Sequence, residues 1–87
     1  MTYNIVYKKS VERDLTKLSK SEARRVLNQI EEELSRKADK YPVLKGQFGG
    51  LRKYRVGDYR VIYAILGDEV VVLLRIGHRK EVYKKKM

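Results

Sequence analysis

The chain has 87 residues and a formal net charge of +10, with no cysteine and a single histidine. This length predicts one small domain spanning residues 1–87. The absence of cysteine excludes disulfides, thiolate metal sites and a cysteine nucleophile, and one histidine argues against a histidine-based metal cluster. The positive charge predicts a polyanionic partner, with nucleic acid as the first candidate and an acidic protein as the second.

Membrane and export signals are missing from the pattern of apolar residues. No apolar run approaches the roughly 20 residues that a membrane span requires. The first ten residues lack the basic-then-apolar layout of a signal peptide. We therefore expect a cytoplasmic protein that makes no membrane contact.

The first half of the chain predicts a strand followed by a pair of helices. Residues 3–7 are rich in aromatic and β-branched side chains, which favour a strand. Ser10 is the expected N-cap of a first helix, because apolar residues follow it at spacings of four and three. Ser19 and Glu22 fit a capping box at the start of a second, longer helix, which is expected to end near Lys37.

The second half predicts a meander of three strands after a loop at residues 39–50, in which Tyr41 is expected to pack over the core edge. The pairs Gly57-Asp58 and Gly67-Asp68 separate three β-type runs and predict tight hairpins. The last two runs are apolar on both faces, so they are expected to be central. We predict an α+β fold: a strand, a two-helix hairpin and a three-stranded antiparallel meander in a small antiparallel sheet.

Basic side chains recur inside these predicted strands, where a purely structural sheet would carry few. Arg60 lies in an otherwise apolar run, so its guanidinium must be paired or must face a binding site. An ion pair with Asp58 or Glu69 is the structural alternative. Lys53 and Arg55 share one strand face, and a hairpin would bring them to Arg60. Such a patch suits a phosphodiester, whose charge rises in the transition state.

Three further candidates follow the last strand. Histidine exchanges protons readily near neutral pH, so His78 is a candidate acid or base; the alternative is a surface or capping residue. Arg79 is a candidate phosphate clamp. Tyr83 is expected either to stack on a base or move a proton, or to anchor the tail through apolar contacts. The basic residues that follow it, Lys84–Lys86, are typical of an electrostatic tail.

Several well-known motifs are absent from the sequence. It contains no phosphate-binding loop, no dinucleotide-binding glycine pattern and no HExxH zinc motif. Its acidic residues do not form a recognisable two-metal set. Chemistry without metal or cofactor is therefore favoured.

Two segments resemble the RelE/ParE toxin superfamily, with the closer resemblance to RelE-like toxins of archaea and bacteria. They are L-x-K-Y-R-V-G-D-Y-R-V-I-Y at Leu51–Tyr63 and I-G-H-R-K-E-V-Y at Ile76–Tyr83. The resemblance implies a RelE-like fold and the toxin of a type II toxin–antitoxin system. It further implies a metal-independent, ribosome-dependent endoribonuclease that cuts mRNA in the A site and is blocked by a RelB-like antitoxin.

The resemblance also implies roles for individual residues. Two basic residues before the hairpin act on the RNA and match Lys53 and Arg55, while the arginine that binds the scissile phosphate matches Arg60. A second arginine matches Arg79 and a C-terminal tyrosine matches Tyr83. Neighbouring basic residues are expected to add RNA contacts: Arg52, Lys80, Lys84 and Lys85.

The implied mechanism is attack by the RNA 2′-hydroxyl on its own 3′-phosphate. The base would be Lys53, Arg55 or Tyr83, and Arg79 or His78 would protonate the leaving 5′-oxygen. Two alternatives remain open at this point. One is a ParE-type gyrase inhibitor, which shares the fold but generally lacks this set of side chains. The other is an RNA-binding module without catalytic activity.

Overall fold

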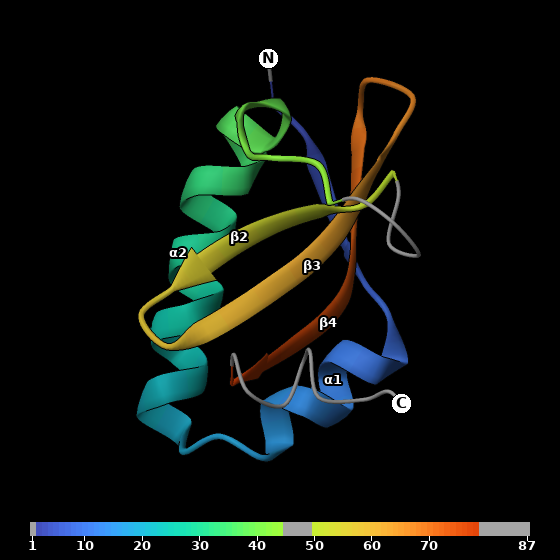
Figure 1. Cartoon of the computed structure of the whole chain (residues 1–87). Coiled ribbons are helices and arrows are strands. Elements are labelled where there is room, and N and C mark those ends of the chain that lie inside the picture. The colour runs from blue at the N-terminus through green and yellow to red at the C-terminus, as the bar shows by residue number, and fades with distance from the viewer. Residues whose placement is uncertain (1, 45–49, 79–87) are drawn as a thin grey trace.

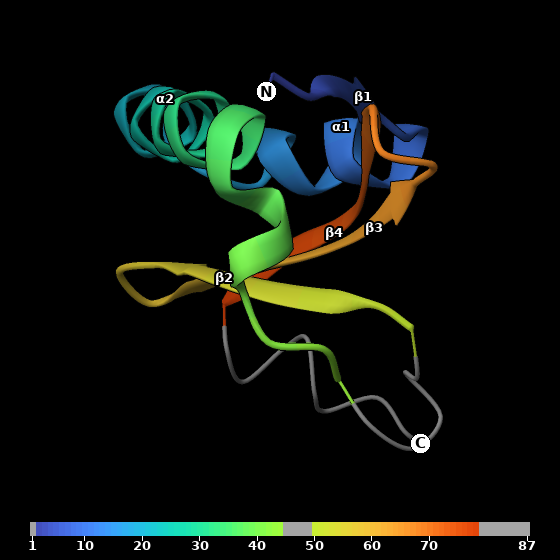
Figure 2. The same cartoon turned by 90° about the horizontal axis from the view of Figure 1, so that it is seen from above.

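The computed structural model describes residues 2–44 and 50–78, which form two helices and a four-stranded sheet (Figure 1). No helix within these ranges is long and apolar enough to cross a membrane. The helices cover one face of the sheet (Figure 2). The elements follow one another as β1 Asn4–Tyr7, α1 Lys9–Thr16, α2 Lys20–Lys37, a 3-10 turn at Ala38–Lys40, β2 Arg52–Val56, β3 Tyr59–Leu66 and β4 Val70–His78.

The sheet confirms the predicted meander and corrects the expectation of a sheet that is antiparallel throughout. Its strand order is β1-β4-β3-β2, and both hairpin pairs are antiparallel. β1 pairs with β4 in parallel, from Asn4 opposite Val70 to Tyr7 opposite Leu73. The sheet is therefore mixed, because the helices intervene before the meander and its last strand runs in the direction of β1. β3 and β4 are the interior strands, as their apolar faces predict.

The two hairpins turn at the predicted Gly-Asp pairs. Gly57 and Gly67 both have a φ of +60°, which glycine adopts without the steric strain of a Cβ atom. Only Gly57 and Asp58 separate β2 from β3. This short connection fixes which residues of the two strands lie opposite each other.

The predicted helix caps have different outcomes. Ser19 is the N-cap of α2, and its hydroxyl accepts a hydrogen bond from the Glu22 amide at 3.2 Å, as predicted. The prediction for Ser10 is wrong, because α1 begins at Lys9 and its N-cap is Lys8. The Ser10 hydroxyl instead donates to the carbonyl of Leu74 in β4 at 2.7 Å. A contact distant in sequence thus replaces the local cap.

The core lies between the sheet and α2, with α1 closing one end. Tyr63 is fully buried at its centre, and its hydroxyl donates to the Ala38 carbonyl at 2.6 Å. A bulge opposite Ile62 and Tyr63 inserts one extra residue into β4. Ile76 therefore joins Val71 and Leu73 in the core, although strict alternation along the strand would put it on the opposite face.

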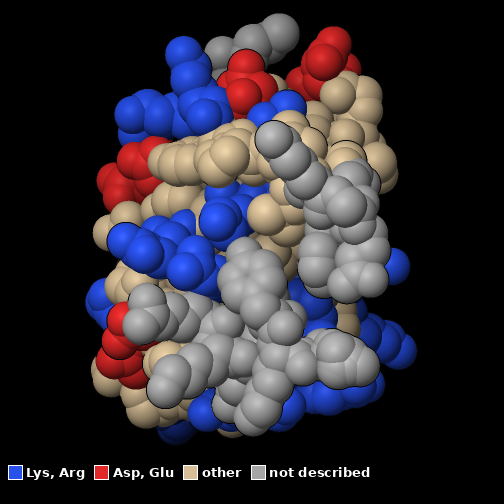
Figure 3. Space-filling model, in the orientation of Figure 1, with Lys and Arg blue, Asp and Glu red and all other residues tan. Residues whose placement is uncertain are grey.

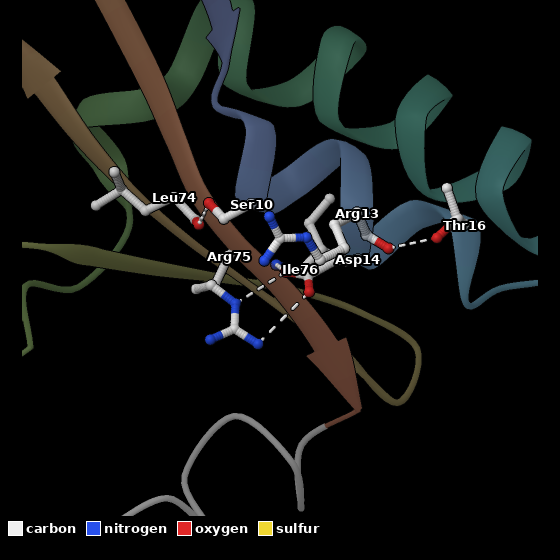
Figure 4. A network of polar contacts seen from close by, with 7 residues as sticks. All are labelled: Ser10, Arg13, Asp14, Thr16, Leu74, Arg75 and Ile76. Carbon is white, nitrogen blue, oxygen red and sulfur yellow. Dashed lines mark hydrogen bonds and ion pairs between the residues drawn. The ribbon is translucent and has the colours of Figure 1, made fainter.

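Side chains of α1 cover the part of β4 that β1 does not reach. Asp14 is buried, and its Oδ2 accepts hydrogen bonds from the Ile76 amide and from Arg75 Nε, both at 2.9 Å (Figure 4). Ser10 binds the Leu74 carbonyl on the same strand. These contacts satisfy main-chain groups that would otherwise remain exposed at a strand edge.

We expect Asp14→Ala to lower the free energy of unfolding by about 2–3 kcal/mol, because the Ile76 amide and the Arg75 guanidinium lose a shared charged acceptor. Urea denaturation measures this change. The matched control is Glu12→Ala, which removes an exposed carboxylate from the same helix and should change stability by less than about 0.5 kcal/mol. Equal losses in the two variants would contradict the structural role of Asp14.

Candidate functional site

Three predicted cationic residues line one groove at the β2–β3 hairpin. Lys53, Arg55 and Arg60 border a space of about 320 Å³. Its remaining described lining comes from Tyr41, Pro42 and Tyr54. No acidic residue belongs to this described lining, so the groove has a positive character.

The strand register explains why these cations meet. Arg55 lies directly opposite Arg60 in the hairpin, and Lys53 lies opposite Ile62. Side chains alternate between the faces of a strand, and the neighbours Tyr54 and Val56 are buried on the helix side. The three cations therefore belong to the face that the helices leave uncovered, as predicted from strand parity. In Figure 3, Lys and Arg atoms lie over the middle of this face and acidic atoms lie at its margins.

Direct opposition of two arginines is unusual for a purely structural hairpin. Like charges at facing positions destabilise a strand pair, whereas opposite charges stabilise it. An anion beside Arg55 and Arg60 interacts favourably with both guanidinium groups. The hairpin is therefore better suited to binding an anion than to stabilising itself.

The segment 41–44 forms the outer wall of the groove and pairs with the edge of β2. Val43 bridges to Arg52, and the Lys53 amide donates to the Pro42 carbonyl at 3.2 Å. Arg52 Nη1 donates to the Tyr41 carbonyl at 2.6 Å. Arg52, a predicted RNA contact, thus holds this wall from the helix side of the strand. Its contact with RNA stays a prediction.

Tyr41 packs against the core, as predicted, and it also belongs to the lining of the groove, which was not anticipated. Its ring contacts that of Tyr54, with centroids 4.9 Å apart. Its hydroxyl donates to Glu33 Oε1 at 2.8 Å. No local pattern in the loop sequence indicates this placement, because it depends on β2 and α2 together.

Burial and the bond to Glu33 together raise the pKa of Tyr41 to about 12. Burial is also the main cause of the raised pKa of Tyr54. Both phenols are therefore protonated at neutral pH. Their hydroxyls donate to Glu33 and Gln29 of α2, and they are unsuited to act as bases.

His78 lines a different pocket, of about 250 Å³, between α1 and the ends of β3 and β4. It lies opposite Tyr59 in the strand register, and the two rings meet edge to face at 6.2 Å. Arg60, the neighbour of Tyr59, lies opposite Gly77. Among the described residues, the structure thus separates His78 from the groove. Its catalytic role stays a prediction.

The other predicted residues of the C-terminal segment lie outside the described ranges. Their roles in catalysis or RNA binding stay predictions. These residues are Arg79, Lys80, Tyr83, Lys84 and Lys85.

Comparison with protein families identifies one that spans most of the chain. The family described as the ParE toxin of type II toxin–antitoxin system, parDE, matches residues 5–83. No curated protein sequence matches the chain.

Several solved structures share this fold. A chain of the RelBE2 toxin–antitoxin complex from Mycobacterium tuberculosis is 30% identical, with a TM-score of 0.85 over 91% of this chain and 93% of that one. A chain of the archaeal RelE–RelB complex from Pyrococcus horikoshii is 34% identical, with a TM-score of 0.68 over 91% and 97%. A chain of the chromosomal ParDE system from P. aeruginosa is 13% identical, with a TM-score of 0.70 over 88% and 96%, and shows similarity of fold alone.

The raised pKa of Tyr41 predicts a stability change at alkaline pH. An unfolded tyrosine ionises near pH 10 and folded Tyr41 near pH 12, so its contribution to stability is complete below pH 10 and declines as pH rises toward 12. Tyr41→Phe removes this ionisation. Urea denaturation at pH 9 and pH 11.5 should show a smaller loss of stability in the variant than in the wild type. Identical losses would contradict the raised pKa.

Proposed function

Because the chain belongs to the RelE/ParE superfamily of type II toxins, we propose that it is a RelE-type endoribonuclease that cleaves mRNA in the ribosomal A site. The observation that supports this proposal is the convergence of Lys53, Arg55 and Arg60 on one groove. These three cations offer a complementary charge to a phosphodiester in a groove of about 320 Å³. The fold alone would not carry the proposal, because one fold hosts several activities.

The groove offers electrostatic stabilisation of an in-line displacement. The 2′-oxygen forms a bond to the adjacent phosphorus, the bond from phosphorus to the 5′-oxygen breaks, and a 2′,3′-cyclic phosphate remains. Negative charge on the phosphoryl oxygens increases as the pentacoordinate transition state forms. Cations that are already in place stabilise that charge without reorganising.

Two protons must also move, one from the 2′-hydroxyl and one to the leaving 5′-oxygen. The proposed base is Lys53, Arg55 or Tyr83, and the proposed acid is Arg79 or His78. Guanidinium groups hold their protons strongly near neutral pH, so arginines act mainly as fixed charges. Alignment of the 2′-oxygen with the phosphorus therefore supplies much of the acceleration, for which about 7–11 kcal/mol is attainable.

A ParE-type gyrase inhibitor is the second candidate, and the family match favours it. Two observations support the ribonuclease instead. The relatives at 30% and 34% identity come from RelBE2 and RelE–RelB complexes. The cationic groove also suits phosphate chemistry, whereas inhibition of gyrase by protein contact does not require it.

We expect Arg60→Ala to slow mRNA cleavage by at least about 100-fold, because one fixed charge beside the phosphate is lost. Primer extension on mRNA from a translating extract measures the cut sites and their rate. Arg24→Ala is the matched control, since it removes an exposed arginine from the outer face of α2 and should cleave normally.

Arg60→Lys is the control for misfolding. It retains the positive charge, so it should cleave mRNA faster than Arg60→Ala. Wild-type cleavage by Arg60→Ala would refute the site. Intact mRNA together with trapped gyrase–DNA complexes would favour the ParE-type alternative. RNA binding without cleavage would favour the other alternative, an RNA-binding module without catalytic activity.

A cognate RelB-like antitoxin is the proposed protein partner. The net charge of +10 on a small domain favours an acidic chain, and the relatives above occur in toxin–antitoxin complexes. We expect the product of a short neighbouring gene to co-purify with this protein and to block cleavage. The association rate should fall as salt concentration rises, since surface charges mainly steer encounter. Failure to co-purify would contradict this partner.

A further inference from the structure

The pocket beside α1 contains two cations that the proposed cleavage does not use. It has a volume of about 250 Å³ and lies between α1 and the ends of β3 and β4. Lys17 and Arg75 belong to its lining, together with Asp14. The volume is several times the roughly 30 Å³ that one water molecule occupies in the liquid, so the pocket has room for a small anion.

The guanidinium group of Arg75 is held at this pocket by a buried partner. Its Nε donates to Asp14 Oδ2 at 2.9 Å, and its Nη2 donates to Oδ1 at 3.5 Å (Figure 4). An arginine has five N–H donors, so three of them are not used by Asp14. The Arg75 side chain is 48% exposed, whereas that of Asp14 is 6% exposed. The pair therefore exposes donors beside the pocket and keeps its carboxylate covered.

The charge of the described lining favours an anion over a metal cation. Asp14 is the only acidic residue of that lining, and Arg75 balances its charge. Lys17 adds a further positive charge, so the lining is cationic even when its histidine is counted as neutral. Guanidinium and ammonium groups bind phosphate through charge-assisted hydrogen bonds. An arginine that is already ordered loses little entropy when it binds such a group.

This pocket lies on the other side of the sheet from the cationic groove. Tyr59 and His78 line the pocket and lie opposite each other in the β3–β4 register. Tyr59 packs against the core, on the side that the helices cover. Arg60 follows Tyr59 and belongs to the groove, because successive residues of a strand point to opposite faces. The two sites are therefore separate, and an anion in one does not occupy the other.

We propose that Lys17 and Arg75 bind a phosphate group in this pocket, which is a second anion site of the molecule. Arg75 supplies donors that Asp14 orients, and Lys17 supplies a flexible ammonium group. The inference goes beyond the proposed function, because it requires neither mRNA cleavage nor the groove. The phosphate group belongs either to a small free phosphate compound or to an RNA strand, since both offer negatively charged oxygens to the two side chains.

The test uses the full chain and the ring signals of His78 in a proton NMR spectrum. His78 is the only histidine of the sequence and lines the pocket, so these signals report its occupancy without overlap from another histidine. Inorganic phosphate is titrated at constant pH, and so, separately, is a short RNA that is 2′-O-methylated throughout and has no terminal phosphate. We expect one or both to shift the signals in a saturable manner. Sodium chloride at the same ionic strength should not do so.

Lys17→Glu should weaken this binding at least about tenfold, because a carboxylate that repels phosphate replaces the ammonium group. Lys9→Glu is the matched control. It makes the same change of charge at the first residue of α1, and Lys9 is not among the residues that line the pocket. Both lysines are exposed, so neither substitution removes a core contact.

The possible results separate this site from the proposed nuclease activity. Equal affinity in Lys17→Glu and Lys9→Glu, or no saturable shift with either ligand, would overturn the site. Lys17-dependent shifts with inorganic phosphate would support it with a free phosphate compound as the source, and such shifts with RNA alone would support it with RNA as the source. Lys17-dependent binding by a protein that leaves ribosomal mRNA intact would support the site and refute the nuclease.

Discussion

The buried carboxylate of Asp14 joins the helical layer to the sheet at the point where β1 ends. It accepts hydrogen bonds from the Ile76 amide and the Arg75 side chain, while Ser10 binds the neighbouring Leu74 carbonyl. The distal half of β4 therefore has a defined position although β1 does not pair with it. β3 pairs with this half of β4, and Arg60 lies opposite Gly77. The location of the cationic groove thus depends on a contact made on the other side of the sheet.

The helices lie on only one face of the sheet, and the other face is available for a functional surface (Figure 2). Both helices cover one face, so alternate side chains of β2 and β3 are free to be charged (Figure 2). A small domain gains limited stability from its core, and like charges at facing positions of a strand pair repel each other. Departures of this kind from the best local choice are characteristic of functional sites. The hairpin of Arg55 and Arg60 combines such a departure with the groove that is proposed to bind phosphate.

Membership of the RelE/ParE superfamily establishes the fold and the class of toxin, and the proposal of a nuclease on that fold depends on the groove. Lys53, Arg55 and Arg60 favour phosphate chemistry. His78 belongs to a separate pocket beside α1, so the described part of the site is electrostatic in character. In the proposed nuclease, alignment of the substrate before the reaction would therefore supply much of the acceleration.

The sequence by itself determined the α+β class, the two hairpins, the cap at Ser19 and the shared face of Lys53 and Arg55. These features depend on turn chemistry, capping and alternation, which act over a few residues. Only the tertiary structure decided the parallel pairing of β1, the role of Ser10, the bulge in β4 and the position of Tyr41 beside the cations. Each of these depends on contacts between residues far apart in the chain, where packing and main-chain hydrogen bonding override local preference.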